Sequence, residues 1–413
     1  MSQPIDPAEI ATAAENLERT LFEVKKVIVG QDRVVERLLV CVLSKGHALL
    51  EGVPGLAKTL AAETIARVVG GTFARIQFTP DLLPADVMGT RIYRSGTESF
   101  DVELGPVFAN FVLADEINRA PAKVQSALLE VMAEKQVSIG GKSYPVPLPF
   151  LVLATQNPIE QEGVYPLPEA QRDRFLMKIV VDYPTPAEEV EIVQRMGVTP
   201  PQPVETLSIE GLAHLQAVTD SIFVAREVVD YAVSLVLATR EPERFGLGDL
   251  SELISYGSSP RASLGLVAAG RALALMRGRT YVLPQDVFEV APDILRHRLV
   301  LSYEALARDI GVDDILARLL STVPAPRVAP SQDLTAHHRA QPHFGSVVAP
   351  SAGASPSSGT TTTALVTDVP GMLPPPPAPP SSSPWASPAS SPTTDDQEAT
   401  GTDQAATWPS GRS

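Results

Sequence analysis

The segment that most constrains the fold is Gly52-Val53-Pro54-Gly55-Leu56-Ala57-Lys58-Thr59, which lies between an apolar run at 47–50 and a helix-forming segment at 60–67. A strand, a glycine loop and a helix in this order predict a phosphate-binding loop, whose backbone N–H groups and helix N-terminus surround an anion. Lys58 can reach the outer phosphates, and the Thr59 hydroxyl can hold magnesium. The alternative is a tight turn with an incidental lysine. A tight turn needs neither the preceding strand nor the following helix, and both are present here. The predicted nucleotide-binding residues here are Gly52, Val53, Pro54, Gly55, Leu56, Ala57, Lys58, Thr59 and Leu60.

One position departs from the usual phosphate-loop pattern, in which a glycine precedes the lysine. Ala57 stands there instead. We expect Gly52 and Gly55 to supply the unusual backbone angles and Ala57 to be helical already, where alanine costs little.

Composition limits the classes of protein that this chain can form. Its 413 residues are enough for two domains, 44% are hydrophobic, and the formal net charge of −15 disfavours a protein held on nucleic acid by phosphate contacts. The single cysteine, Cys41, excludes an internal disulfide and fits a buried apolar position in a helix. Acidic residues interrupt the N-terminus where a signal peptide would be apolar, and no run is long enough to span a membrane. We therefore expect a cytoplasmic protein.

Strand-like and helical patterns alternate through the first half of the chain. This alternation predicts an α/β fold, a parallel sheet with helices on both faces. Two segments interrupt it: 88–105, and a predicted hairpin at 135–147 that turns at Gly140-Gly141. The predicted strands are 47–50, 73–78, 110–116, 150–155 and 175–181, and the predicted helices include 8–27 and 121–134.

Beyond Pro184 the sequence predicts helices only. Ser259 and Pro260 begin one of them well, as N-cap and first-turn residue. From about Pro324 the chain is rich in proline, serine and threonine and has little apolar periodicity, which predicts disorder. The predicted helices are 187–196, 208–219, 224–240, 260–276, 284–297 and 303–320, and the predicted domains are 1–184, an all-α domain at 185–323 and the tail at 324–413.

Two acids end the predicted strand 110–116. Asp115 and Glu116 therefore project at the carboxyl edge of the sheet, where ligands bind in open α/β folds. Asp115 would take magnesium through its water shell, and Glu116 would polarise the attacking water of ATP hydrolysis. Paired acids also mark ordinary strand-to-turn junctions, but the phosphate loop upstream favours the catalytic interpretation.

Four further residues are candidates for contact with the phosphates. Asn157 follows the strand 150–155 and can hold a water or a γ-phosphate oxygen, although asparagine before proline is also a routine turn residue. Arg172 and Arg174 precede the last strand and can stabilise a transferring phosphoryl group, often across a subunit boundary, or form surface salt bridges. Arg261 lies in the first turn of a helix, where a cation opposes the helix dipole, and this placement indicates a role other than helix stability.

Together these residues resemble the AAA+ ATPases and, within them, the MoxR type, over roughly residues 8–320. Ala57 is the residue that the MoxR type carries in the loop. The motifs that carry the resemblance are Val29-Gly30-Gln31, residues 52–59, residues 114–120, Ala154-Thr155-Gln156-Asn157-Pro158, residues 169–175 and residues 257–262.

The resemblance implies roles for these residues. The phosphate loop is the Walker A motif, Asp115 and Glu116 form Walker B, and Gly30 and Gln31 lie near the adenine. Asn157 is then the first sensor and Arg261 the second. Arg174 best fits the arginine finger, with Arg172 as the alternative. The resemblance also implies that 88–105 contains the helix-2 insertion and that this segment and the hairpin 135–147 face the pore of a homo-oligomeric ring, with a hexamer as the expected form.

The resemblance further implies an ATP- and Mg²⁺-dependent chaperone that remodels or assembles a partner, often a protein with a von Willebrand factor A domain. Two alternatives stay open: a nucleic-acid motor, which the acidic charge disfavours, and the ATPase subunit of a metal chelatase, whose specific insertions we do not recognise.

Overall fold

The computed structural model describes residues 6–326 except 97, 159–162 and 198. These residues all lie within one structural unit, residues 1–339. Residues 327–413 of the predicted tail lie outside the described residues.

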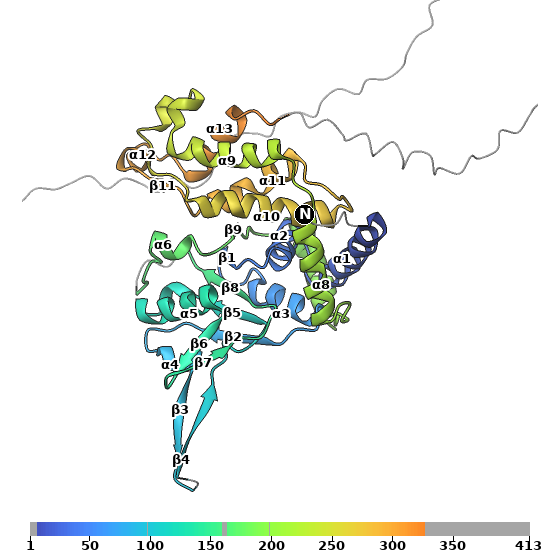
Figure 1. The fold of residues 1–413 in the computed structure, drawn as a ribbon, viewed down its shortest axis with the longest axis vertical. Helices are drawn as coiled ribbons and strands as arrows, with labels where there is room; N and C mark the ends of the chain where they lie inside the picture. The colour runs from blue at the N-terminus through green and yellow to red at the C-terminus, as the bar shows by residue number, and fades with distance from the viewer. Residues whose placement is uncertain (1–5, 97, 159–162, 198, 327–413) are drawn as a thin grey trace, which may run out of the picture. The chain divides into compact units, whose positions relative to one another are not determined.

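A five-stranded parallel sheet forms the centre of the first half (Figure 1). Its strand order is β2-β5-β8-β1-β9, so the first strand is internal and the chain crosses over between neighbouring strands. All five predicted strands are confirmed. Their bounds are β1 (Ala48–Glu51), β2 (Phe73–Gln77), β5 (Phe111–Asp115), β8 (Leu151–Gln156) and β9 (Met177–Val180).

Both faces of this sheet are covered by helices. Successive side chains of a strand point to opposite faces, so each strand contributes to the packing on both. In β5, Phe111 and Leu113 belong to one apolar cluster, while Val112 and Ala114 belong to the other. The first cluster includes residues of α1 (Pro7–Val27), α2 (Asp32–Leu43) and α3 (Lys58–Val68), and the second includes residues of α5 (Ala122–Glu134). The sheet with helices on both faces is thus confirmed, and Cys41 is fully buried on α2 as expected.

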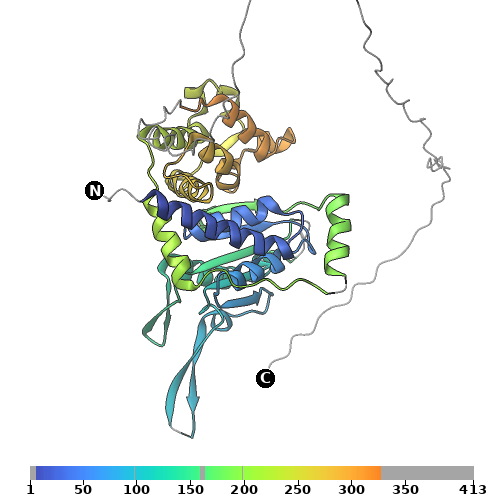
Figure 2. The same ribbon diagram turned by 90° about the vertical axis from the view of Figure 1, so that its right-hand side faces the viewer.

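The two interruptions are both antiparallel hairpins. The first follows α4 (Pro84–Met88) and pairs β3 (Gly89–Arg94) with β4 (Ser99–Leu104), and it extends away from the sheet (Figure 2). The second pairs β6 (Gln136–Ile139) with β7 (Lys142–Pro145). It turns at Gly140 and Gly141 as predicted, both with positive φ.

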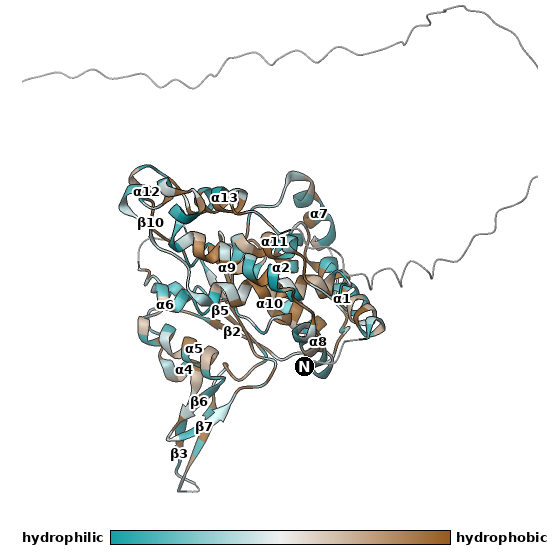
Figure 3. Ribbon diagram, turned by 45° about the horizontal axis from the view of Figure 1, so that its top comes forward, coloured by the Kyte–Doolittle hydropathy of each residue, from teal (hydrophilic) through white to brown (hydrophobic). Residues whose placement is uncertain are grey.

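The chain beyond Pro184 is mostly helical, and the buried apolar residues of α10 (Pro260–Met276) belong to the first apolar cluster (Figure 3). One detail differs from the all-helical prediction. A short antiparallel pair, β10 with β11, is present, and its two- and three-residue strands are too short to leave a sequence pattern. The elements are α7 (Pro186–Met196), α8 (Ile209–Ser221), α9 (Arg226–Arg240), β10 (Ile254–Tyr256), α10 (Pro260–Met276), α11 (Pro284–Leu295), β11 (Val300–Leu301), α12 (Tyr303–Ala307) and α13 (Val312–Thr322).

The single helix predicted at 303–320 is wrong, because α12 and α13 divide this segment. Asp309 lies between them with φ +55°, a left-handed conformation that cannot continue a right-handed helix. The backbone of Gly311, the N-cap of α13, donates to the Asp314 carboxylate at 2.9 Å and starts the second helix.

Buried charge joins the helical part to the core. Asp293 of α11 is 1% exposed and accepts from Arg33 at 2.8 Å and Arg37 at 3.0 Å, both on α2. Such a pair is costly to break on one side, since the remaining charge would stay buried. No helix among the described residues is long and apolar enough to cross a membrane.

Candidate nucleotide-binding site

The phosphate loop connects β1 to α3, as the sequence predicts. Gly55 has φ +86° and open space at its Cβ position. Ala57 corrects one expectation: it is the N-cap of α3 with φ +55° and ψ +20°, so it is left-handed rather than helical. An L-residue pays about 1 kcal/mol for this conformation, so the loop carries local strain at Ala57.

Lys58 is held against the phosphate loop by a hydrogen bond. Its ammonium donates to the Gly52 carbonyl at 2.6 Å. Partial burial lowers the pKa of Lys58, while the charges of Asp115 and Glu116 act in the opposite direction. Asp115 ends β5 and the phosphate loop follows β1, so both lie at the carboxyl edge of the same parallel sheet, as a shared phosphate site requires.

Asp115 is fixed by neighbours on both sides of its strand. The Thr155 hydroxyl, on β8, donates to Oδ1 at 2.6 Å. Arg75, on β2, donates to Oδ2 from Nη2 at 2.6 Å and from Nε at 3.1 Å. Asp115 is only 8% exposed, so the two N–H groups of Arg75 that converge on Oδ2 offset part of the cost of burying the carboxylate.

Glu116 follows Asp115 in the left-handed region, with φ +56°. Its backbone N–H donates to the Thr155 hydroxyl at 2.8 Å, so one threonine orients both acids. Its carboxylate accepts from Gln77 at 2.9 Å and pairs with Arg119 at 3.1 Å. A strained residue at a strand end is a common feature of functional sites, because the surrounding contacts must enforce it.

Asn157 and Arg172 line one cavity of about 500 Å³ at the same edge of the sheet. Asn157 is 6% exposed and follows β8, and Glu51 at the end of β1 lines the cavity too. Arg172 lies 3.7 Å from Glu169 within α6 (Glu169–Arg172). The structure thus places Asn157, the candidate first sensor, and Arg172, one of the two candidates for the arginine finger, on the same cavity.

Arg174 and Arg261 do not line this cavity. Arg174 is exposed and donates to the Leu129 carbonyl of α5 at 2.8 Å. Arg261, at the start of α10, pairs with Asp173 at 3.2 Å instead of with Glu116 or Asp115.

Gly30 and Gln31 adjoin the segment that follows β9. The Gln31 side chain donates to the Asp182 carbonyl at 2.9 Å. Gly30 has φ +72°, and an added Cβ would meet the Glu188 side chain at 2.5 Å. Glycine is therefore required at this position, on both conformational and steric grounds.

The donor set fits magnesium. Among the described residues no group of three or more His, Cys, Asp or Glu could hold a metal ion. Magnesium needs no such cage, because it keeps several waters and takes other ligands from substrate phosphates. Thr59 and Asp115 supply the hard oxygen atoms that it prefers.

Four residues of this region were missed in the sequence: Arg75, Gln77, Thr155 and Asp173. The carboxyl-edge rule that selects Asp115 also selects Gln77 and Thr155, since they lie at the ends of β2 and β8. Arg75 lies two residues inside β2, and nothing in its local sequence indicates its partner.

The fold and this edge define a phosphate-loop ATPase with a helical lid, and comparisons with known proteins agree. Residues 47–177 match the model of the ATPase family associated with various cellular activities (AAA), and residues 249–319 match the AAA lid domain. The chain is 66% identical over 319 residues to Chaperone MoxR1 of Mycobacterium tuberculosis, covering 77% of this chain and 85% of that protein. It is 41% identical to YeaC of Bacillus subtilis, covering 75% and 95%.

A solved structure gives the same result. The crystal structure of a protein of Cytophaga hutchinsonii described as an ATPase aligns with a TM-score of 0.74 and 46% identity, covering 78% of this chain and 98% of that one. The chain belongs to the MoxR-type AAA+ ATPases.

Proposed function

We propose that this protein binds and hydrolyses ATP with Mg²⁺ and uses the cycle to remodel or assemble a partner protein. One observation carries the proposal. Thr155 of β8 donates to Asp115 at 2.6 Å and accepts from the Glu116 backbone N–H at 2.8 Å, and the neighbouring strand, β1, leads into the phosphate loop that carries Lys58. The 66% identical relative is named a chaperone, which supports the remodelling role.

In this proposal each residue has a distinct task. Lys58 exchanges the Gly52 carbonyl for outer phosphate oxygens, which gives the half-buried ammonium a charged partner. Thr59 and Asp115 hold the magnesium, which neutralises phosphate charge when bound. Glu116 leaves Gln77 and Arg119 to orient a water, and Asn157 holds that water or a γ-phosphate oxygen.

The assembly is also part of the proposal. We infer a homo-oligomeric ring, with six subunits as the proposed number, because the exposed Arg174 is suited to a neighbouring subunit's nucleotide. We further propose the division into a core at 1–184, a lid at 185–323 and a tail at 324–413, a cytoplasmic location and a partner with a von Willebrand factor A domain. The net charge of −15 disfavours the nucleic-acid motor.

The test separates binding from turnover. Glu116→Gln is expected to bind Mg·ATP as the wild type does and to abolish turnover, whereas Lys58→Ala weakens binding itself. Glu134→Gln, an exposed acid at the end of α5, is the matched control and stays at the wild-type rate. Wild-type turnover in Glu116→Gln would refute the water-orienting role.

A further inference from the structure

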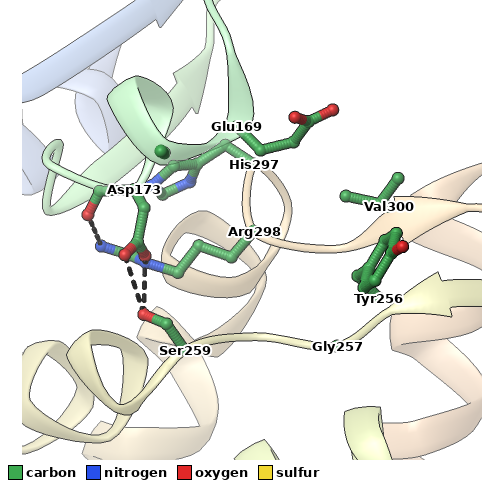
Figure 4. Close-up of a pocket in the computed structure, with 9 residues that line it drawn as sticks. Glu169, Asp173, Tyr256, Gly257, Ser259, His297, Arg298 and Val300 are labelled. Atoms are coloured by element: carbon green, nitrogen blue, oxygen red, sulfur yellow. Dashed lines mark hydrogen bonds and ion pairs between the residues drawn. The ribbon is translucent and has the colours of Figure 1, made fainter.

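A second carboxylate, Asp173, collects hydrogen bonds from residues distant in the sequence (Figure 4). The Ser259 hydroxyl lies 2.9 Å from each of its oxygens. Arg298 donates to Oδ1 from Nε at 2.8 Å, and Arg261 donates to Oδ2 from Nη1 at 3.2 Å. Asp173 itself stands between Arg172 and Arg174, and its side chain is 17% exposed.

Arg298 fixes the position of Asp173. It is 7% exposed and also donates to the carbonyls of Asp173 at 3.3 Å, Phe175 at 2.6 Å and Leu176 at 3.1 Å. The carboxylate and its own backbone are therefore held by one buried guanidinium. Asp173 is a rigid acceptor, and groups that bind it take their orientation from it.

Arg261 is an exposed member of this cluster. Its side chain is 56% exposed. A guanidinium has five N–H donors, and the ion pair with Asp173 engages one nitrogen, Nη1, so donors remain for a second anion. Ser259 supports the same geometry, since its hydroxyl accepts from the Arg261 backbone N–H at 3.2 Å while it contacts Asp173.

We propose that Asp173 is a positioning residue that orients Arg261 toward the nucleotide of the same subunit. The carboxylate holds one edge of the guanidinium, and the free edge meets the phosphates. This inference rests on the proposed ATPase function, in which Arg261 is the second sensor. A purely structural role would instead confine Asp173 to joining α10 and Arg298 to the end of α6.

A double-mutant cycle on nucleotide binding distinguishes the two roles. The probe is ATPγS with Mg²⁺, measured by calorimetry for the wild type, Asp173→Asn, Arg261→Ala and the double variant. A charge-assisted hydrogen bond contributes about 1.5–3 kcal/mol, so Arg261→Ala should weaken binding roughly 10- to 100-fold. Asp173→Asn should weaken it by about 3- to 10-fold, and the double variant should match Arg261→Ala within about twofold.

Additive losses in the double variant would overturn the proposal, because Asp173 would then act independently of Arg261. Asp220→Asn, which removes an exposed ion pair with Lys45, is the matched control and should bind as the wild type does. If Asp173→Asn loses its cooperative thermal transition, Asp173→Glu replaces it in the same cycle. It keeps the charge but displaces the carboxylate, so the same non-additivity is expected and additivity again refutes the proposal.

Failure of the proposed function is recognised separately. A wild-type protein that binds neither ATPγS nor ATP would refute the ATPase proposal and this inference with it. Binding and turnover in the wild type, together with an additive cycle, would refute the role of Asp173 alone.

Discussion

Asp115 and Asp173 are both carboxylates held by arginine, but they are held in different ways. Asp115 is fixed inside one sheet: Arg75 and Thr155 reach it from the strands on either side of β5. Asp173 is fixed by Ser259, Arg261 and Arg298, which all come from the helical part that follows the sheet. The first carboxylate depends on strand register, whereas the second depends on where the lid lies. The first site is therefore preorganised by the sheet, and the second forms only where the helical part packs against α6.

The largest expected effect tests the arginines beside Asp173. Arg174→Ala should lower turnover by roughly 10³-fold or more, since an arginine finger contributes about 10³–10⁵ in other phosphoryl-transfer enzymes. Mixing Arg174→Ala with Lys58→Ala should restore part of the activity, because Lys58→Ala subunits can supply Arg174 to an intact neighbouring pocket. Activity is measured on mixed oligomers that have been verified by affinity-tag capture.

The matching mixture with Arg172→Ala decides between the two finger candidates. No recovery in the Arg174 mixture would argue against action in trans. Recovery with Arg172→Ala alone would transfer the role to Arg172.

The next effect tests the preorganised carboxylate. Arg75→Met leaves Asp115 buried with Thr155 but without its counter-ion, and should lower the free energy of unfolding of the nucleotide-free protein by about 1–3 kcal/mol. Thermal or denaturant unfolding measures the change. Arg67→Met, which removes an exposed pair with Glu63, is the control and should cost less than about 1 kcal/mol. Equal losses in both variants would mean that Asp115 does not need Arg75.

A smaller effect is expected at Ala57. Ala57→Gly should remove the left-handed strain and stabilise the folded loop by about 1 kcal/mol, partly offset because glycine is more flexible in the unfolded chain. A net shift between zero and about +1 kcal/mol in unfolding free energy is the expected result. Clear destabilisation would show that the left-handed angle is not a strained feature of the loop.

The smallest effect concerns the tail. A chain ending at Thr322, the last residue of α13, should unfold cooperatively and hydrolyse ATP at the full-length rate. Neither carboxylate site takes a hydrogen bond from beyond this residue in the part of the chain described. Loss of the cooperative transition on truncation would contradict this expectation.

Much of the phosphate site could be predicted because its residues lie in short, recognisable segments. Asp115 and Glu116 end an apolar strand, and Lys58 follows a glycine loop, so local pattern and the edge rule placed them together. Ala57 was assigned the wrong backbone conformation because alanine alone favours a helix, while the loop geometry imposes the left-handed one. The helix predicted at 303–320 was wrong for a similar reason. The apolar spacing continues through this segment, but the left-handed backbone at Asp309 ends the helix.

The sequence by itself determined the five strands of the central sheet, the helices on both of its faces, and the place of the phosphate loop and the two acids at its carboxyl edge. Only the tertiary structure decided the partners of the charged groups. Arg75 lies 40 residues from Asp115, and Arg298 lies 125 residues from Asp173. Such pairs depend on strand register and on the docking of the lid helices, which arise from the packing of the whole chain. Local propensity and periodicity carry no information about them.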